Sequence, residues 1–369
     1  MLRCHARHGA QLELNGQNSV PVETSVAPPR LKLSTIQAAR GIAALLVVLF
    51  HSTDLYRLTF KSVFLANIFS NGAVGVDVFF VLSGFIIYYI HRKDLGERSR
   101  ALGFAKKRIV RIYPIYIIAV TLKFALLNMP GFRSGGPKFS LLDYLHSASL
   151  FPLEESRRLI QVSWTLTHEM LFYALFLVGI LLSRRILVAI IAVWTVAMTA
   201  AAFTDATSLP IALQVVLATR NFGFLSGMGL AWLITRPSIV LPSRAILAGG
   251  TLVFLGAYAA ARHIPHAAGI LGIGAGTAMI VYGLLSEERR GGIRYPNWLS
   301  FLGDASYSIY LVHTIVISTV YTVLAGKLHL TGLPIYLQPL VPLSAIAFGC
   351  VAYLLVERPL LNRMRPWTR

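Results

Sequence analysis

The sequence contains few charged residues and almost no cysteine. Only 13% of its 369 residues are Asp, Glu, Lys or Arg, whereas a soluble domain usually carries about 25%. The two cysteines, Cys4 and Cys350, lie near opposite ends of the chain and give neither a disulfide framework nor a metal-ligand spacing. We therefore expect no metal site and no permanently bound cofactor. The shortage of charge argues against an ordinary soluble protein.

Hydrophobic residues make up 56% of the chain and occur in long runs. A helix that crosses a bilayer needs about 20 mostly apolar residues. Ten runs meet this requirement, which predicts an all-α, polytopic membrane protein with its helices in one bundle. The predicted spans are 34–53, 73–90, 111–129, 163–182, 186–204, 211–234, 244–261, 266–285, 304–325 and 336–356. The segment 141–152 is too short to span, so we expect it to be interfacial or re-entrant.

The residues outside these runs show no sign of another folded domain. Residues 1–33 are polar, contain prolines and show no cleavable signal peptide, so we interpret them as a mobile cytoplasmic tail. Residues 34–359 are expected to form the membrane domain, and 360–369 a short basic cytoplasmic tail.

The formal net charge of +19 is explained mainly by membrane topology. Most of the 34 Lys and Arg residues fall in one alternate set of loops, and short basic loops stay on the cytoplasmic side of a membrane. With ten spans, this bias places both termini in the cytoplasm. The expected partner of the chain is then the lipid bilayer, and no nucleic acid is needed to explain the charge.

The first span carries a guanidinium at one end and an imidazole at the other. Arg40 and His51 are eleven positions apart, which is about 16 Å of helical rise and a return to nearly the same azimuth. Both side chains therefore lie on one stripe of the helix, Arg40 near the inner face and His51 near the outer face. Taken one at a time, they are more simply interpreted as an interfacial anchor and a boundary residue.

Several other ionisable residues lie at membrane depth, where an unpaired charge is costly. Asp77 and Glu169 fall near the outer ends of their spans, and Arg220 falls in the middle of another. Arg220 has two interpretations, a buried ion pair with Asp77 or Glu169 and an anion clamp for a ligand. His168 directly precedes Glu169, and the sequence leaves open which of the two faces the bundle interior.

Two arginines near the inner end of the third span form a candidate anion site. Arg108 and Arg111 are three positions apart and share a helical face. Paired guanidiniums suit a phosphate ligand, and contact with lipid headgroups is the alternative. Further polar and aromatic side chains are candidates for supporting or acceptor-binding roles: Asp77, Ser83, Ser163, Trp164, His168, Tyr173 and His313. For His313, a satisfied buried histidine is the simpler interpretation.

The polar residues divide by depth, with arginines towards the inner side and His51 towards the outer side. Histidine is the usual general base for a hydroxyl near neutral pH, so this arrangement indicates transfer of a group across or within the membrane. The main alternative is a secondary transporter of a polar or anionic small molecule, because transporters also carry charges at membrane depth. The paired repeats common in transporters are not visible in the sequence.

Six stretches together resemble the membrane-bound acyltransferase-3 family, which includes bacterial O-antigen and exopolysaccharide O-acetyltransferases. They are RGIAALLVVLFH (40–51), GAVGVDVFFVLSGF (72–85), RIVRIYP (108–114), SWTLTHEMLFY (163–173), SYSIYLVH (306–313) and VERP (356–359). The family's pattern of an arginine, ten intervening residues and a histidine falls on Arg40 and His51. Its Arg-x-x-Arg pattern falls on Arg108 and Arg111.

This resemblance implies a cytoplasmic acyl-CoA donor, usually acetyl-CoA, and a sugar or glycolipid hydroxyl as acceptor at the outer side of the bacterial inner membrane. It implies that His51 is the catalytic base and Glu169 its acidic partner. The donor-binding candidates are Arg40, Arg108, Arg111 and Arg220. The chain is too short for the fused extracytoplasmic domain that some members carry, so we expect it to pass the acyl group to the acceptor or to a separate polysaccharide-assembly protein.

Overall fold

The structure is a computed structural model that describes residues 33–129, 139–152, 157–204, 208–236, 238–260, 263 and 266–368. The chain divides into two compact units, Met1–Lys32 and Leu33–Arg369. The tail expected at 1–33 therefore lies, except for Leu33, outside the described residues.

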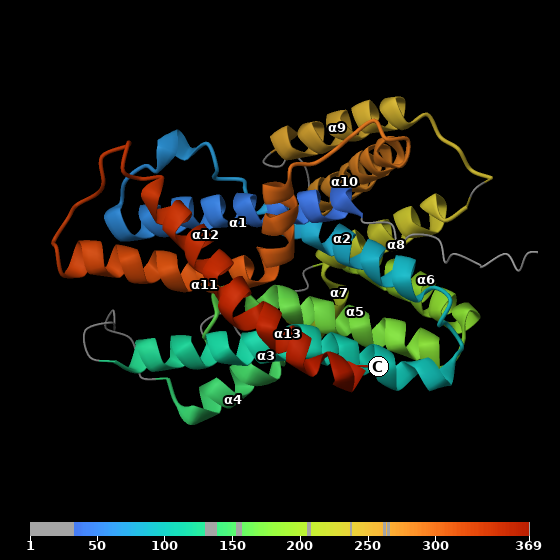
Figure 1. Ribbon diagram of the computed structural model, residues 1–369, viewed down its shortest axis with the longest axis horizontal. Helices are drawn as coiled ribbons and strands as arrows, with labels where there is room; N and C mark the ends of the chain where they lie inside the picture. Colours follow the sequence, from blue (N-terminus) through green and yellow to red (C-terminus); the bar gives the residue numbers. More distant parts are fainter. Residues whose placement is uncertain are drawn as a thin grey trace, which may run out of the picture. The chain divides into compact units, whose positions relative to one another are not determined.

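The second unit is helical, and its described residues contain no strand (Figure 1). Its α-helices are α1 (Ser34–Phe60), α2 (Val74–His91), α3 (Arg98–Asn128), α4 (Leu141–Ser149), α5 (Trp164–Leu181), α6 (Arg184–Ala201), α7 (Ile211–Leu217), α8 (Phe222–Ile234), α9 (Ser243–Ala260), α10 (His266–Arg289), α11 (Asn297–Gly326), α12 (Leu340–Ala352) and α13 (Arg358–Met364). Ten helical segments in the described residues are long and apolar enough to cross a membrane. The prediction of an all-α protein with ten spans is confirmed.

Some helices extend beyond the predicted spans. α3 begins at Arg98 and α11 at Asn297, whereas the apolar runs begin at 111 and 304, because hydropathy detects only the apolar part of a helix. The segment expected to be too short to span contains α4, which begins with a capping box between Ser140 and Asp143. The segment 360–369, expected to be a tail, is helical through Met364.

The span predicted at 211–234 is interrupted. α7 ends at Leu217, Ala218 is extended, and a short 3₁₀ turn over Thr219–Asn221 leads into α8. The side-chain amide of Asn221 donates hydrogen bonds to the carbonyl oxygens of Val215 (2.9 Å) and Val216 (3.2 Å). A broken membrane helix needs such partners for its freed carbonyl groups, and Asn221 supplies them.

Helices α1 and α11 pack closely and run in the same direction (Figure 1). At their start, the hydroxyl of Thr35 donates to that of Tyr295 (3.1 Å), just before α11 begins. At their end, the Tyr56 hydroxyl donates to the carbonyl oxygen of Leu333 (3.2 Å), just after α11 ends. A Cβ atom on Gly303 would overlap the α1 backbone, so glycine allows this close contact. We call the two ends of the bundle the Ser34 end and the Phe60 end, after the first and last residues of α1.

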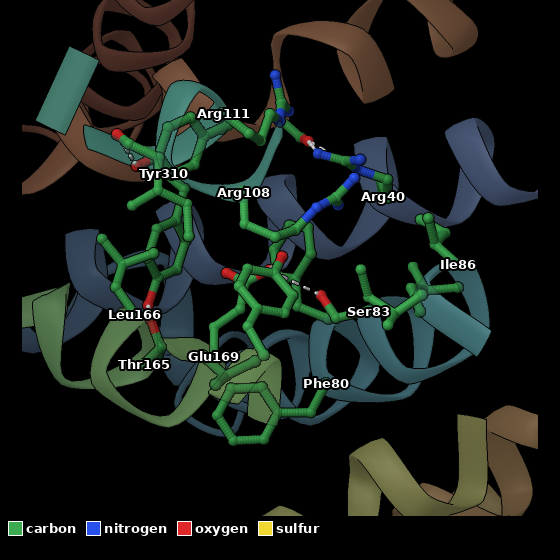
Figure 2. Close-up of a pocket in the computed structure, with 18 residues that line it drawn as sticks. Arg40, Phe80, Ser83, Ile86, Arg108, Arg111, Thr165, Leu166, Glu169 and Tyr310 are labelled. Carbon is green, nitrogen blue, oxygen red and sulfur yellow. Dashed lines mark hydrogen bonds between the residues drawn. The ribbon is translucent and has the colours of Figure 1, made fainter. Parts of the chain in front are cut away.

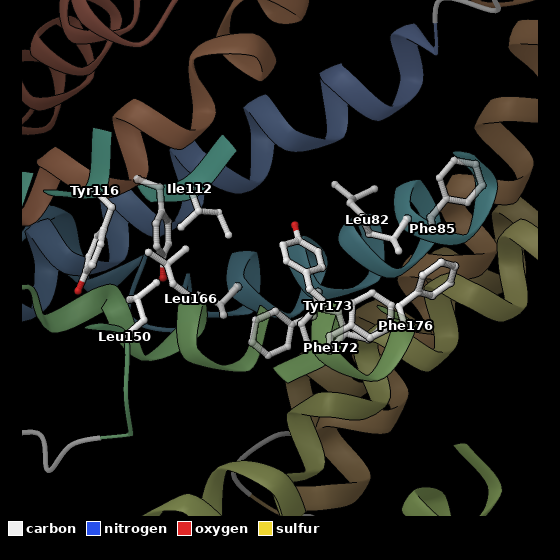
Figure 3. Close-up of a cluster of buried hydrophobic side chains, with 14 of the residues drawn as sticks. Leu82, Phe85, Ile112, Tyr116, Leu150, Leu166, Phe172, Tyr173 and Phe176 are labelled. Atoms are coloured by element: carbon white, nitrogen blue, oxygen red, sulfur yellow. The ribbon is translucent and has the colours of Figure 1, made fainter. Parts of the chain in front are cut away.

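Helices α2, α5 and α8 meet around a stack of phenylalanine rings. Phe224 of α8 stacks on Phe80 of α2 and on Phe172 of α5, with ring centroids 4.5 Å apart in each pair. Figure 3 shows Phe172 among the buried apolar side chains of this region. This stack fixes α5 beside α2 and so positions the polar side chains that both helices carry.

Glycine also sets the distance between α2 and α8. A Cβ atom on Gly227 would overlap the carbonyl oxygen of Val81, whereas one on Gly229 would meet nothing within 4 Å. We therefore expect Gly227→Ala to lower the free energy of unfolding by about 1–3 kcal/mol, the usual cost of overpacking. Gly229→Ala, two positions away in the same helix, is the control. This substitution should leave the free energy of unfolding unchanged or raise it. Thermal unfolding in detergent measures both, and equal effects would contradict the close contact.

Candidate active site

A central cavity lies among α1, α2, α3, α5 and α11. Its volume is about 840 Å³ when the space open to solvent is included. The polar side chains that line it are Arg40, Ser83, Arg108, Arg111, Thr165, Glu169, Tyr173, Ser306, Tyr307 and Tyr310. Figure 2 shows the side chains of Arg40, Arg108 and Arg111 on one side of the cavity and Glu169 across from them. The structure therefore brings the three predicted inner arginines together with Glu169.

The three arginines are held in different ways. Arg40 donates two hydrogen bonds to the hydroxyl of Ser306 (3.0 and 3.2 Å). Arg111 forms an ion pair with Glu357, which is 1% exposed and also accepts a hydrogen bond from Ser308 (2.6 Å). The charge of Arg111 is thereby balanced by a buried carboxylate.

Arg108 is the arginine best placed to accept a ligand. Its guanidinium lies over the rings of Phe104 and Tyr173, with 5.7 and 5.6 Å to the ring centroids. Its Nε atom is buried and has no hydrogen-bond partner among the described residues. Because an unsatisfied buried donor is costly, this atom favours an anionic or carbonyl group in the cavity.

Glu169 is fixed by two hydroxyl groups. Its Oε1 atom accepts hydrogen bonds from Ser83 (3.3 Å) and from Tyr173, one turn further along α5. Glu169 and Tyr173, four positions apart, thus share one face of α5. Both of these partners were supporting candidates in the sequence, and both line the central cavity.

His51 lies in a second cavity, which we call the His51 cavity, nearer the Phe60 end. It is lined by His51, Arg158, Gln161, Val162, Trp164, His168, Ile211, Gln214 and Val215. The neighbours His168 and Glu169 thus face different cavities, since successive residues of a helix point about 100° apart. His168 Nδ1 is hydrogen-bonded to Oδ1 of Asn221 (2.9 Å). The structure does not bring His51 and Glu169 into one cavity.

The partner of His51 is His313 of α11. His313 is fully buried, and its Nδ1 is 3.2 Å from the carbonyl oxygen of Ile309, so in the neutral ring Nδ1 carries the proton. Its Nε2 then accepts a hydrogen bond from Nδ1 of His51 (3.1 Å), which also contacts the carbonyl oxygen of Val47 (3.1 Å). This network assigns the proton of neutral His51 to Nδ1 and leaves Nε2 as its basic nitrogen.

Two hydroxyl groups separate the cavities. The hydroxyls of Tyr310 and Thr165 are 2.8 Å apart, and both contact the carbonyl oxygen of Val162. Tyr310 and Thr165 line the central cavity, whereas Val162 lines the His51 cavity. Ser163, a supporting candidate, is buried in the turn that precedes α5.

Arg220 forms an ion pair with Asp77 (2.7 Å), and its guanidinium lies over the ring of Trp164 at 5.4 Å. It lines none of the cavities described above. Of its two interpretations, the structure shows the ion pair, and the anion clamp stays a prediction. Trp164 is held by this cation and lines the His51 cavity with its neighbour His168.

We expect Asp77→Leu to destabilise the protein by about 1.5–3 kcal/mol, because the guanidinium of Arg220, which is 24% exposed, then loses its charged hydrogen-bond partner. The double variant Asp77→Leu/Arg220→Met should recover most of this loss, since the two apolar side chains can pack together. Thermal unfolding in detergent tests the stability. An increased donor KM in the folded double variant would instead support the anion clamp.

Sequence reasoning did not select Glu357, Ser308, Tyr310 and Thr165 as site residues. Glu357 had a signal, because it is a carboxylate directly after the last apolar run. The three hydroxyl residues had no such signal, since Ser, Thr and Tyr occur widely in membrane helices. Ser306, Tyr310 and His313 share one face of α11, and each contacts α1 or the start of α5.

A polytopic helical bundle with an arginine-lined interior cavity and a hydrogen-bonded pair of histidines suits a membrane-embedded group-transfer enzyme. The acyltransferase domain of the acyltransferase-3 family matches residues 33–356, and the chain belongs to this family. The protein is therefore a membrane acyltransferase, and the transporter alternative is set aside.

Two relatives cover most of the chain. This chain is 35% identical to the exopolysaccharide production protein ExoZ of Rhizobium meliloti (strain 1021) over 314 residues. The match covers 80% of this chain and 92% of ExoZ. The chain is 27% identical over 308 residues to BcsY of Komagataeibacter xylinus, whose name describes a membrane-bound transacylase, with 77% of this chain and 73% of BcsY covered. No solved structure shows a significant match to the chain.

Proposed function

We propose that the protein transfers an acyl group, most simply acetyl, from acyl-CoA to a sugar hydroxyl of an exopolysaccharide or its glycolipid precursor. The observation that carries this proposal is the pairing of two cavities along α1 and α11. One is lined by three arginines, and the other contains His51 with a basic Nε2. The name of ExoZ supports a polysaccharide acceptor.

The distribution of basic residues supports a cytoplasmic Ser34 end and an outward-facing Phe60 end. In the bacterial inner membrane, the central cavity would then receive its donor from the cytoplasm. The His51 cavity would receive its acceptor from the outer side. Both termini of the chain would lie in the cytoplasm, and polysaccharide-assembly proteins would present or collect the sugar.

The central cavity suits the phosphate-bearing donor. Arg108 offers an unpartnered buried donor atom, and Arg40 adds a second guanidinium whose contact in the described residues is a neutral hydroxyl. Guanidiniums bind phosphate oxygens through charge-assisted hydrogen bonds. Glu169 would accept hydrogen bonds from the amide N–H groups of the pantetheine arm, since it lies across the cavity from the arginines.

His51 would act as the general base for the acceptor. As the sugar oxygen attacks the thioester carbonyl carbon, Nε2 takes the hydroxyl proton. The carbon–sulfur bond then breaks, and the imidazolium returns this proton to the departing CoA thiolate, so an ester and CoA thiol are formed. During the step, the Nδ1–H of His51 donates to Nε2 of His313, which orients the charged ring. The acyl arm must pass Tyr310 and Thr165 to reach this base.

Radiolabelled acetyl-CoA and inside-out membrane vesicles that contain the protein test the proposal. We expect label to enter polysaccharide or glycolipid covalently, and only when an acceptor is present. Vesicles without the protein are the control. Label that enters the vesicles but remains on a small molecule would contradict the proposed reaction.

A further inference from the structure

A third cavity, which we call the Arg358 cavity, opens at the Ser34 end of the bundle. Its open volume is about 680 Å³. Arg40 and Arg111 line both this cavity and the central one, so the two spaces meet at these guanidiniums. Arg358 and Asn362 are exposed at its rim, which makes it accessible to water. A ligand that reaches the central cavity from this end therefore passes through it.

A rare helical distortion shapes one wall of this cavity. Between α12 and α13, residues Tyr353–Glu357 form a π-helical turn, a distortion found frequently at functional sites. The turn directs Glu357 inward to Arg111. Tyr353, the first residue of the turn, and Arg358, the residue that follows it, both line the cavity. Arg358 and Asn362 are four positions apart and share a helical face.

Gln37 lines the cavity and carries an unsatisfied polar atom. Oε1 of Gln37 is buried and has no hydrogen-bond partner among the described residues. A buried carbonyl oxygen without a partner costs free energy, which a ligand N–H donor would recover. Asp304 places a carboxylate in the same cavity, and a carboxylate can accept hydrogen bonds from hydroxyl or amine groups of a ligand.

We propose that the Arg358 cavity binds the adenosine of the acyl-CoA with its 3′-phosphate, while the diphosphate of the same donor reaches the arginines shared with the central cavity. Arg358 binds a phosphate, the Tyr353 ring stacks on the base, and the amides of Gln37 and Asn362 hydrogen-bond the edge of the base. The inference rests on the proposed function and names the residues that recognise the end of the donor remote from the acyl group. The pantetheine arm then continues past Arg40 and Arg111 into the central cavity.

A nucleotide fits this cavity better than an anionic lipid headgroup does. The carboxylate of Asp304 would repel an anionic headgroup, whereas ribose hydroxyls and a base amine can donate hydrogen bonds to it. Two side-chain amides offer both donors and acceptors, which match the mixed edge of adenine. An aromatic ring provides a stacking surface that a headgroup does not need.

The test compares two donors, acetyl-CoA and S-acetylpantetheine, which lacks the nucleotide and all phosphates. We expect Arg358→Ala to raise the KM for acetyl-CoA about 10-fold, the effect of one charge-assisted contact, and to leave that for S-acetylpantetheine unchanged. Arg363→Ala is the matched control, because Arg363 is an exposed arginine of the same helix that does not line the cavity. Adenosine 3′,5′-bisphosphate should inhibit the wild type and the Arg363→Ala variant more strongly than the Arg358→Ala variant.

The ratio of the two KM values is measured within each variant, so a lower yield of folded protein does not affect it. Equal changes for both donors, or no change for either, would overturn the nucleotide site. The assay is repeated in vesicles of phosphatidylcholine alone and with added phosphatidylglycerol. An effect of Arg358→Ala that requires the anionic lipid would also overturn it and assign the cavity to a headgroup. Failure of the wild type to use either donor would instead refute the proposed function.

Discussion

Replacing His51 with alanine is expected to lower turnover by about 10²- to 10⁴-fold, the usual contribution of a general base. The hydroxyl of the acceptor then has no group to take its proton, while the arginines of the central cavity are untouched. The KM for acetyl-CoA should therefore stay close to that of the wild type. His313 remains fully buried in the variant, with its Nδ1 still bonded to Ile309, so we expect the protein to insert and fold.

Purified protein in detergent or vesicles allows this measurement with radiolabelled acetyl-CoA and a polysaccharide acceptor. His146→Ala is a matched control, because His146 lies on the short helix α4 and lines none of the three cavities. Normal turnover in folded His51→Ala protein would remove His51 from the reaction. Equal losses in both variants would indicate a general effect of removing a histidine at this end of the bundle.

Arg108→Ala is expected to raise the KM for acetyl-CoA by about 10- to 100-fold. A hydrogen bond to a charged group contributes about 1.5–3 kcal/mol, and Arg108 is the guanidinium with an unpartnered buried Nε. The KM for the acceptor should change much less, because Arg108 does not line the His51 cavity. The loss of the cation over the Phe104 and Tyr173 rings makes a smaller contribution to the same variant.

Steady-state kinetics with each substrate varied in turn separates the two KM values. Lys107→Ala removes an adjacent, exposed positive charge that lines no described cavity, so it shows whether charge alone steers the donor. A larger change for the acceptor than for the donor would refute the assignment. Arg111 is less suitable for this test, because its removal leaves the buried carboxylate of Glu357 without its ion-pair partner.

Helical periodicity predicts which residues of one helix share a face, and here it was informative. The common stripe of Arg40 and His51 follows from their spacing, and both side chains contact α11 in the structure. The same periodicity could not predict that His313 is the partner of His51, 262 residues away. Which helices pack together depends on contacts such as that at Gly303, and a hydrophobic pattern does not specify them.

Charge and hydropathy located the membrane segments but not their interruptions. Arg220 was predicted within a continuous span because the run around it is apolar. The break at Ala218 depends on the amide of Asn221, and the choice of Asp77 as the ion-pair partner depends on how α2 packs against α8. The family resemblance implied that Glu169 is the acidic partner of His51. In the structure, Glu169 lines the central cavity and accepts hydrogen bonds from Ser83 and Tyr173, whereas His51 lines another cavity.

The parallel pairing of α1 and α11 has a consequence for the choice of donor. Both Arg40 and His51 project from one uninterrupted helix, and both are braced by the same neighbouring helix. In the proposed reaction, the helical rise of about 16 Å between these two residues sets how far the thioester extends from the phosphates that Arg40 binds. Donor length, more than the size of the acyl group, would then decide which thioesters can react.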